Sequence, residues 1–378
     1  MRPTQTGQPE QPWTKRRHST ALIAGMIAPL VLVLVGCATS SDGQLAAQDA
    51  TPIVEKGFIY DEAPYPEAHA STIVQLSDGR IAASWFGGTK ERNPDVSIWY
   101  VVQESGIWGE PVMVATGEQP DGSRLPTWNP VLYQVPDGDL ILFYKIGPNP
   151  REWWGMKIAS SDGGATWSAP ERLPDGILGP IKNKPVTLED GTIVSPTSIE
   201  GDMRDGWSLY FERSEDGGKT WAATHYVETP EGIDAIQPSI LFHEDGRLQA
   251  LARTRQGNVA MSWSDDDGLN WTPVAATVLP NPNSGTDAVT LADGRQLIVY
   301  NPTAHNPETP GKGYRYPIRV AVSDDGLAWQ DVATLDTEAL PSGYAYPSVI
   351  QSADGMVHIT YTHNRERITH VVLDPTRF

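Results

Sequence analysis

The feature that most constrains the fold is a short motif that recurs along the chain. It reads Ser-Ser-Asp-Gly-Gly-Ala-Thr-Trp at 160–167, Ser-Glu-Asp-Gly-Gly-Lys-Thr-Trp at 214–221 and Ser-Asp-Asp-Asp-Gly-Leu-Asn-Trp at 264–271, and Asp324, Gly326 and Trp329 mark a worn copy. The intervals between the tryptophans are 54, 50 and 58 residues, which suits one four-stranded sheet per repeat. This repeat predicts a β-propeller in which each copy supplies one blade.

The motif has the composition of a tight turn. An Asp side chain accepts hydrogen bonds from backbone N–H groups a few residues further on, and the glycines permit positive φ. The Trp ring supplies a large apolar surface to bury beside the turn. We therefore expect Asp162, Asp216, Asp266 and Asp324 to hold the fold rather than to carry chemistry.

A second repeat gives the number of blades. Asp-Gly pairs separate two apolar, strand-like runs at 78–79, 137–138, 190–191, 245–246, 293–294 and 354–355. Asp-Gly between such runs is a strong hairpin signal. The six hairpins predict an all-β fold, a six-bladed propeller with four-stranded antiparallel blades. Trp108, which follows Ser105-Gly106, is interpreted as the decayed motif of blade one.

The N-terminus has the pattern of an export signal. Lys15-Arg16-Arg17 precedes an apolar run at 21–35, which is shorter than the roughly 20 residues that cross a bilayer. Leu34-Val35-Gly36-Cys37 resembles the bacterial lipobox, which implies that Cys37 is lipidated; the alternative is an ordinary signal peptide with a chance cysteine. Cys37 is also the single cysteine, so no intrachain disulfide can form.

These signals predict three regions and a location. We expect a signal peptide at 1–36, a flexible polar tether at 37–52 and the propeller at 53–378. The protein would be anchored in the bacterial cell envelope, at the outer membrane or the periplasmic face, or be extracellular. Its contact with the membrane would be through the N-terminal lipid alone.

The charge balance disfavours nucleic acid as a partner. Without residues 1–36 the chain keeps 24 basic and 46 acidic side chains, a net charge of −22. Nucleic-acid binding normally requires a basic face. An anionic substrate is still possible, because a pocket can be basic within an acidic protein.

The polar positions of the repeat predict one pocket. In a propeller, the innermost strand of each blade begins at the same mouth of the channel, and the residues placed there are His69, Asn129, Lys184, Gln237, Asp287 and Tyr346. The second strands return to this mouth and add further polar side chains: Glu91, Arg92, Asp95, Lys145, Ser198, Glu200, Arg253, Arg255, Asn301, Tyr361, His363 and Arg365. A concave pocket with convergent polar groups is the default expectation for an active site.

Three further segments support a family resemblance. With the repeated motifs, Trp128-Asn129-Pro130, the stretch 179–185 and Tyr346-Pro347 make the chain resemble the sialidase (neuraminidase) superfamily, in its BNR or Asp-box repeat group. Typical members hold a substrate carboxylate with three arginines. They attack with a Tyr that a Glu activates, and use an Asp as acid and base, an exception to the usual pair of carboxylates in glycosidases.

The resemblance assigns roles to several residues. It implies that Arg253 and Arg315 bind the carboxylate, that Tyr346 is the nucleophile and that Asp95 is the acid/base. Two positions depart from the family pattern: His69-Ala70-Ser71 stands where Arg-Ile-Pro is expected, and Gln237 stands where the Glu is expected.

Other residues could supply what these departures remove. Since Gln cannot accept the proton of a phenol, Glu91 or Glu200 would have to act as the base. The charge of the missing arginine could come from His69, Lys182 or Lys184. The remaining residues expected to bind substrate are Asn129, Gln237, Asp287 and Arg365.

Three functions are compatible with this pattern. The leading prediction is an exo-acting glycoside hydrolase that removes terminal sialic acid or a related acidic sugar from glycans. The alternatives are a lyase that acts on uronate-containing polysaccharides, with a His or Tyr base, and a non-catalytic glycan-binding lipoprotein. The sequence contains no metal-ligand cluster of recognised spacing and no phosphate loop, so neither a metal nor an organic cofactor is expected.

Overall fold

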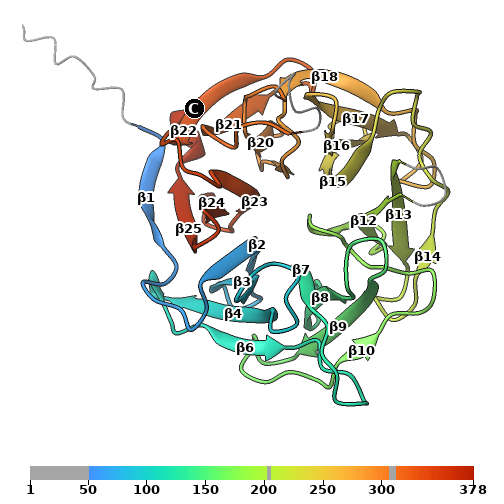
Figure 1. The fold of residues 1–378 in the computed structure, drawn as a ribbon. Helices are drawn as coiled ribbons and strands as arrows, with labels where there is room; N and C mark the ends of the chain where they lie inside the picture. The colour runs from blue at the N-terminus through green and yellow to red at the C-terminus, as the bar shows by residue number, and fades with distance from the viewer. Residues whose placement is uncertain (1–50, 202–205, 306–311) are drawn as a thin grey trace, which may run out of the picture. The chain divides into compact units, whose positions relative to one another are not determined.

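The structure is a computed structural model that describes residues 51–201, 206–305 and 312–378 (Figure 1). The predictions of a signal peptide, of lipidation at Cys37 and of nearly all of the tether fall outside these residues. Six antiparallel sheets stand around the centre of a ring, so the predicted six-bladed propeller is confirmed.

In each sheet the strands follow one another from the channel outward. Blade one contains β2 (Glu67–Gln75), β3 (Ile81–Gly88), β4 (Ser97–Glu104), β5 (Ile107–Trp108) and β6 (Val112–Ala115), the last two both paired with β4. Blade two contains β7 (Thr127–Gln134), β8 (Leu140–Ile146), β9 (Trp154–Ser160) and β10 (Glu171–Arg172). Blade three contains β11 (Val186–Thr187), β12 (Ile193–Glu200), β13 (Trp207–Ser214) and β14 (Ala222–Ala223).

The remaining blades follow the same plan. Blade four contains β15 (Ala235–Phe242), β16 (Leu248–Thr254), β17 (Asn258–Ser264) and β18 (Ala275–Pro280). Blade five contains β19 (Asp287–Thr290), β20 (Gln296–Tyr300), β21 (Ile318–Ser323) and β22 (Gln330–Asp336). Blade six contains β23 (Tyr344–Gln351), β24 (Val357–His363), β25 (Arg367–Leu373) and, as its outermost strand, β1 (Ile53–Phe58).

Strand β1 closes the ring. It pairs antiparallel with β25, with Phe58 opposite Thr369, so the two ends of the described chain share one blade. The short 3₁₀ helix η1 (Pro375–Arg377) follows β25. Among the residues that the structure describes, no helix is long and apolar enough to cross a membrane.

Apolar side chains fill the interfaces between neighbouring blades. Tyr100 of blade one and Tyr144 of blade two belong to one buried cluster, and Val320 of blade five and Val371 of blade six belong to another. Burial of this kind is the main favourable term in folding. Because the blades bury their faces against one another, the ring provides a rigid frame for the residues at its channel.

The repeated motif forms the expected turn. In the first copy, Asp162 Oδ1 accepts from the Thr166 N–H at 2.8 Å, and Ser160 Oγ accepts from the Gly164 N–H at 2.8 Å. The same bonds recur in the copies at 214–221 and 264–271. These polar groups satisfy one another within the turn, so the structural role expected for the motif is confirmed in these copies.

In the worn copy the acid is Asp325, and the prediction of Asp324 is wrong. Asp325 Oδ1 accepts from the N–H groups of Leu327 and Ala328 at 2.8 Å each, and Ser323 Oγ donates to it at 3.0 Å. This copy has one residue fewer between its Ser and its Trp. Counting back from Trp329 therefore selects the wrong carboxylate.

The tryptophans of the motif connect each blade to the one before it. Trp271 of blade four stacks on Phe211 of blade three, with ring centroids 4.0 Å apart. Trp108 has the same relation to the preceding blade, since its ring lies edge-on to His370 of β25 at 5.1 Å. This contact is consistent with the interpretation of Trp108 as the decayed motif of blade one.

The two ends of the ring carry different features. The Asp-Gly turns and the repeated motifs lie together at one end, called the far end below, where Arg80 and Gly163 line one depression. The innermost strands start at the opposite end, called the mouth. The turns between second and third strands, including the segment that carries Glu91 and Asp95, return to the mouth.

Candidate active site

The innermost strands of four blades contain a bulge at the mouth. The pairing register shifts between His69 and Thr72, Trp128 and Val131, Ile236 and Ser239, and Ala345 and Ser348. One residue in each bulge has a left-handed backbone: Ala70 (φ 56°), Asn129 (φ 38°), Gln237 (φ 58°) and Tyr346 (φ 53°). Such strain in residues other than glycine is often found at functional sites.

These bulges correct the blade-to-blade alignment made from the sequence. Each left-handed residue stands eight positions before the Asp of an Asp-Gly turn. The position in blade one that corresponds to Tyr346 is therefore Ala70, with His69 one residue earlier. The same count selects Lys182 and Gly285 in blades three and five, in place of Lys184 and Asp287.

Tyr346 lies at the centre of the contacts at the mouth. Its Oη accepts from Arg253 Nη1 at 3.0 Å and from Gln237 Nε2 at 3.4 Å. Arg253 Nη1 also donates to Gln237 Oε1 at 3.2 Å, which orients the amide so that its NH₂ group faces the phenol. The Tyr346 oxygen therefore faces two donors, and negative charge on it would be stabilised.

Asn283 connects two of the arginines. Arg253 Nε donates to Asn283 Oδ1 at 2.8 Å, and Arg315 Nη2 approaches the Asn283 carbonyl oxygen at 3.5 Å. Burial, and after it the charge of Arg253, lowers the pKa of Arg315 to about 10. The Arg315 guanidinium therefore stays cationic at neutral pH, and with the guanidinium of Arg253 it forms a positive wall beside Tyr346.

A third arginine reaches the cluster from blade six. Arg365 lies in the turn between β24 and β25 with φ 63°, and its carbonyl oxygen accepts from the Ala68 N–H at 2.8 Å. Its guanidinium forms an ion pair with the Glu91 carboxylate. The Glu91 N–H in turn donates to Glu67 Oε2 at 3.1 Å, which fixes this loop of blade one.

His69 is a neutral, buried neighbour of Tyr346. The two rings lie 4.3 Å apart, and His69 Nδ1 lies 3.0 Å from Thr362 Oγ1. Burial lowers the pKa of His69 well below its usual value, and four nearby cations lower it further: Arg365, Arg315, Arg253 and Lys182. His69 therefore adds no positive charge, and the clamp must rely on the arginines.

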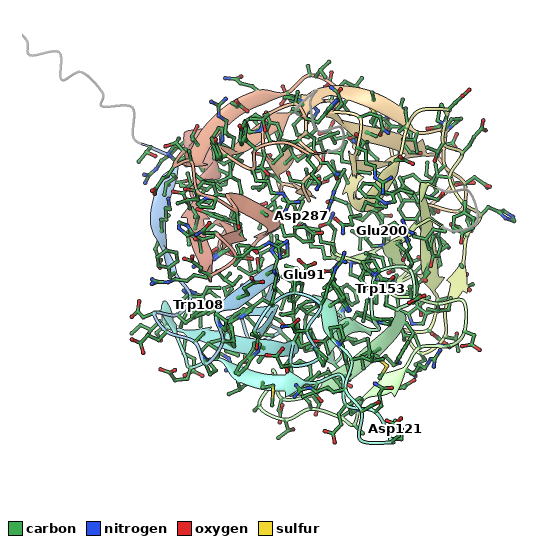
Figure 2. All side chains as sticks on the ribbon, viewed as in Figure 1. Glu91, Trp108, Asp121, Trp153, Glu200 and Asp287 are labelled. Atoms are coloured by element: carbon green, nitrogen blue, oxygen red, sulfur yellow. The ribbon has the colours of Figure 1, made fainter. Side chains whose placement is uncertain are left out.

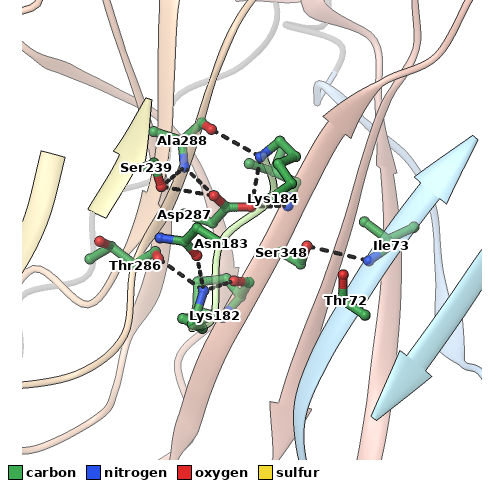
Figure 3. A network of polar contacts seen from close by, with 12 residues as sticks. Thr72, Ile73, Lys182, Asn183, Lys184, Ser239, Thr286, Asp287, Ala288 and Ser348 are labelled. Atoms are coloured by element: carbon green, nitrogen blue, oxygen red, sulfur yellow. Dashed lines mark hydrogen bonds and ion pairs between the residues drawn. The ribbon is translucent and has the colours of Figure 1, made fainter. Parts of the chain in front are cut away.

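Lys182, Lys184 and Asp287 form a buried network (Figure 3). Lys182 Nζ donates to Asn183 Oδ1 at 2.7 Å and to the Thr286 carbonyl at 2.9 Å, and Lys184 Nζ pairs with Asp287 Oδ2 at 2.9 Å. Asp287 also accepts from Ser239 Oγ and from the N–H groups of Ala288 and Val349. Because Asp287 is fully buried and its oxygens are satisfied, this geometry provides structural support and does not bring Asp287 or Lys184 to a ligand.

The glycine at the corresponding position of blade five makes room for this arrangement. A Cβ on Gly285 would lie 3.0 Å from Lys182 Cε and 3.3 Å from Tyr346 Cδ2. The Lys182 ammonium itself lies 5.9 Å from the centroid of the Tyr346 ring. Lys182 Nζ therefore lies against one face of the Tyr346 ring.

The carboxylates stand around the rim of the cluster. Glu91 and Glu200 lie near the centre of the ring, whereas Trp108 and Asp121 lie at its periphery (Figure 2). Burial raises the pKa of Glu200, although Arg253, Arg255 and Arg151 oppose the shift. Partial burial also acts to raise the pKa of Asp95, but hydrogen bonds from the Thr89 hydroxyl and N–H outweigh it and leave that pKa below its usual value.

The sequence of the chain matches one family model. The model of the BNR repeat-like domain covers residues 79–359, which is more than half of the chain. The chain belongs to the BNR repeat-like family. No curated protein matches the sequence.

Solved structures of this BNR repeat-like chain's fold include several sialidases. A Dyadobacter fermentans protein of unknown function is 20% identical with a TM-score of 0.70, and covers 85% of this chain and 98% of its own. The NanB sialidase of Streptococcus pneumoniae is 14% identical with a TM-score of 0.66, and the match covers 87% of this chain and 71% of the NanB chain. The intramolecular trans-sialidase of Ruminococcus gnavus is 14% identical with a TM-score of 0.64, and the match covers 85% of this chain and 97% of the trans-sialidase chain. At these identities the likeness establishes a sialidase-like fold.

Within this family frame, the structure brings together most of the residues named from the sequence. Tyr346, Gln237, Arg253 and Arg315 share one cluster with His69, and the Arg365–Glu91 pair adjoins it. Asn129 lies in the bulge of blade two, buried at the channel. Asp95 is exposed on the loop after β3; its carboxylate accepts from Thr89, and its carbonyl oxygen accepts from Ser97 Oγ and from Arg124.

Two residues expected at the pocket point elsewhere, and two that line it were not anticipated. Tyr361 is buried with its hydroxyl on Asp336, and His363 packs against Phe58, whereas Thr362 between them faces His69. The alternation of a strand dictates this, and the sequence prediction chose the wrong parity. Asn283 was also missed; its place just before β19, at the start of a blade, was the available signal.

Proposed function

We propose that this protein is an exo-acting glycosidase that removes a terminal acidic sugar from glycans. The observation that carries the proposal is the Arg253 guanidinium 3.0 Å from the Tyr346 hydroxyl, inside a cluster that also holds Arg315 and Arg365. Arginine recognises carboxylates through paired N–H donors. A sugar carboxylate held by these arginines would bring its anomeric carbon to Tyr346.

The departure at Gln237 changes how Tyr346 would be activated. Gln237 and Arg253 both donate to the phenol oxygen, so they stabilise the charge that develops when its proton leaves. In the proposed step the Tyr346 oxygen bonds to the anomeric carbon as the bond to the leaving oxygen breaks. Glu91 takes the proton of the phenol. Glu200, whose pKa burial raises, supplies the proton to the leaving group in place of Asp95, whose pKa is lowered, and water later releases the sugar.

Arg365 is proposed to replace the arginine that the family places in blade one. Ala70 occupies the equivalent bulge and carries no functional group, while the carbonyl oxygen of Arg365 accepts from the N–H of Ala68 just before it. A guanidinium from blade six thus stands beside the position of the missing one. Its partner Glu91 holds it in place when no substrate is bound.

A lyase is the second candidate, and the same observation favours it. A tyrosine oxygen that faces two donors beside a clamp for carboxylates can also act as the base that removes a proton next to a neutralised uronate carboxylate. The two reactions give different products, because elimination leaves an unsaturated sugar that absorbs in the ultraviolet and hydrolysis does not.

The deciding experiment offers the purified protein a fluorogenic sialoside and a panel of uronate-containing polysaccharides. Fluorescence, reducing ends and ultraviolet absorbance are followed together. New reducing ends or fluorescence without absorbance, lost in Arg253→Ala, would support hydrolysis. Absorbance would support the lyase. Saturable binding of these glycans without any product would reject both and leave a glycan-binding protein.

Export and lipidation at Cys37 are proposed from the sequence pattern alone. Labelling of the cellular protein with a radioactive fatty acid tests this part. Incorporation that disappears in Cys37→Ser is expected, together with release of the protein from the membrane fraction. Equal labelling of that variant would contradict the proposal.

A further inference from the structure

A cavity adjoins the arginine cluster on the side of blades five and six. It has a volume of about 520 Å³ and is lined in part by Lys312, Tyr314, Tyr316 and Ser342, together with Arg315 and Arg365. This volume falls within the range of small-molecule sites. Because Arg315 and Arg365 belong both to this cavity and to the cluster around Tyr346, the two spaces adjoin.

The charge of the cavity is opposite to that of the whole chain. The chain carries 47 acidic and 28 basic side chains, yet the residues that line the cavity include three cations and no Asp or Glu. Arg365 is paired with Glu91 on the side of Tyr346, and within the described residues Lys312 and Arg315 have no ion pair with a carboxylate. Three cations on the wall of one cavity in an acidic protein indicate a site for an anion.

The walls of the cavity are fixed by backbone hydrogen bonds. The Arg315 carbonyl accepts from the Tyr344 N–H at 2.7 Å, and the Gly343 carbonyl accepts from the Asn364 N–H at 2.9 Å. Gly343 has φ 61°, and a Cβ there would lie 2.6 Å from the Arg315 carbonyl oxygen. Arg315 is therefore held by ordered backbone, which lowers the entropic cost of binding.

An aromatic surface stands beside these cations. Tyr314 is 64% exposed, and its ring centroid lies 5.2 Å from that of Tyr316. Its backbone is held by a hydrogen bond from Thr303 Oγ1 to the Tyr314 carbonyl at 2.7 Å. An exposed aromatic face next to donors suits a sugar ring, which offers apolar C–H groups on its faces and polar groups at its edge.

We infer that this cavity is a subsite for the sugar next to the one cleaved, and that this sugar carries its own acidic group. The inference rests on the proposed function, since it extends the same site by one residue. Tyr314 would contact the ring, and Lys312 with the outer side of Arg315 would hold the acid. The preferred substrate is then a glycan with consecutive acidic residues, rather than an acidic sugar that caps a neutral chain.

The test compares one acidic sugar with two. Calorimetric titration of the full protein, with every variant in the Tyr346→Phe background so that the dimers are not cleaved, would use galacturonic acid against digalacturonate, and N-acetylneuraminic acid against its α2,8-linked dimer. We expect the dimer of the better-bound sugar to bind about 10-fold more tightly than its monomer. In Lys312→Gln the dimer should lose about 5-fold in affinity while the monomer is unchanged. The matched control is Lys219→Gln, an exposed lysine in a far-end motif.

The possible failures are distinguishable. Equal binding of monomer and dimer, or equal effects of Lys312→Gln and Lys219→Gln, would overturn the subsite and leave the proposed function standing. An equal loss for monomer and dimer in Lys312→Gln would also overturn it, because the lysine would then serve the central pocket. Absence of binding by all four sugars would reject the acidic-sugar specificity of both sites.

Discussion

The far end and the mouth of this propeller are built on the same strands by opposite rules. At the far end, successive blades repeat one set of residues, and each set bonds within itself, as Ser214, Asp216 and Thr220 do. At the mouth the six equivalent positions carry six different residues: Ala70, Asn129, Lys182, Gln237, Gly285 and Tyr346. Their contacts cross the ring, and Gln237 and Tyr346 are 109 positions apart.

This comparison separates the residues that stabilise the fold from those proposed to act in the reaction. The repeated side chains have the same structural role in every blade: they terminate a hairpin and pack on the neighbouring blade. Residues that occur once, in left-handed bulges and among charges of both signs, contribute to the single site that the whole ring forms. Changes at the far end should therefore affect stability alone, and changes at the mouth should affect activity first.

The largest effect should follow from removing one oxygen at the mouth. Tyr346→Phe deletes the proposed nucleophile and little else, so kcat should fall about 10³-fold, equivalent to about 4 kcal/mol, without a change in thermal midpoint. Steady-state kinetics and calorimetry measure the two quantities. Tyr133→Phe, which deletes a hydroxyl bonded to Thr187 on the same type of strand, is the control. Retained activity in Tyr346→Phe would remove Tyr346 from the mechanism.

The support beneath the mouth should be the next most sensitive place. The buried Glu212 carboxylate accepts from the N–H groups of Leu178 and Gly179 at 2.7 Å each, just before the segment that carries Lys182. Glu212→Ala leaves these donors unpaired and removes the negative charge that partly offsets the burial of the nearby Lys145, and should lower the free energy of unfolding by about 3 kcal/mol. Urea titration measures it. A loss below about 1 kcal/mol would mean that water replaces the carboxylate.

The contribution of Glu212 to stability should depend on pH near neutrality, whereas that of Asp162 at the far end should not. Burial raises the pKa of Glu212 to about 7, while hydrogen bonds from Thr166 lower that of Asp162 at the far end to about 2. Native Glu212 keeps a proton that the unfolded chain releases above about pH 4.5, so its contribution to stability falls as pH rises from about 5 to 7.

The matched variant isolates this titration. Relative to Glu212→Gln, which has no such proton, the wild type should lose on the order of 2 kcal/mol over that pH interval. Unfolding free energies of both proteins at pH 5 and pH 7 give the comparison. If the unfolding free energies of the two proteins differed by the same amount at pH 5 and pH 7, Glu212 would be ionised in the native protein throughout this interval. Asp162 should not respond in this interval, since it stays ionised in both states.

A smaller effect is expected from the arginine that blade six contributes. Arg365→Gln removes one of three proposed carboxylate ligands, which should raise KM about 10-fold with a smaller effect on kcat. Arg319→Gln, which breaks an exposed ion pair with Asp331 on the outer part of blade five, should leave KM unchanged. A loss of kcat at constant KM would instead give Arg365 a role in the reaction step.

The smallest effect should come from the far end. Ser214 Oγ accepts from the buried Gly218 N–H at 2.8 Å, and Ser214→Ala leaves that donor unpaired. The free energy of unfolding should fall by about 1 kcal/mol, and kcat and KM should be those of the wild type. A change in kinetics from this variant would break the separation of the two ends.

Several parts of the site could be predicted from the sequence because they depend on local spacing. Tyr346 and Gln237 both precede an Asp-Gly turn by the same number of residues, so their convergence follows from the repeat. The choice of His69, Lys184 and Asp287 as equivalents was wrong, because the count back from each Asp-Gly turn was not the same in every blade; a count of eight from Asp78, Asp190 and Asp293 gives Ala70, Lys182 and Gly285. Thr362 was missed because a shift of one residue along a strand reverses which side chains face the channel. Asn283 was missed because it lies in the irregular segment between β18 and β19, where no strand periodicity applies.

The sequence by itself determined the number of blades, the turns that join them and the end of the ring where unlike polar residues collect. It did so because these properties depend on residues a few positions apart, repeated along the chain. The tertiary structure alone decided that Arg365 of blade six stands beside Ala70 of blade one and that His69 is buried and neutral. It also decided that Asp287 is buried and stabilises the network around Lys184 instead of contacting a ligand. Those properties depend on burial and on charges brought together across the ring, and closure of the ring by β1 fixes them.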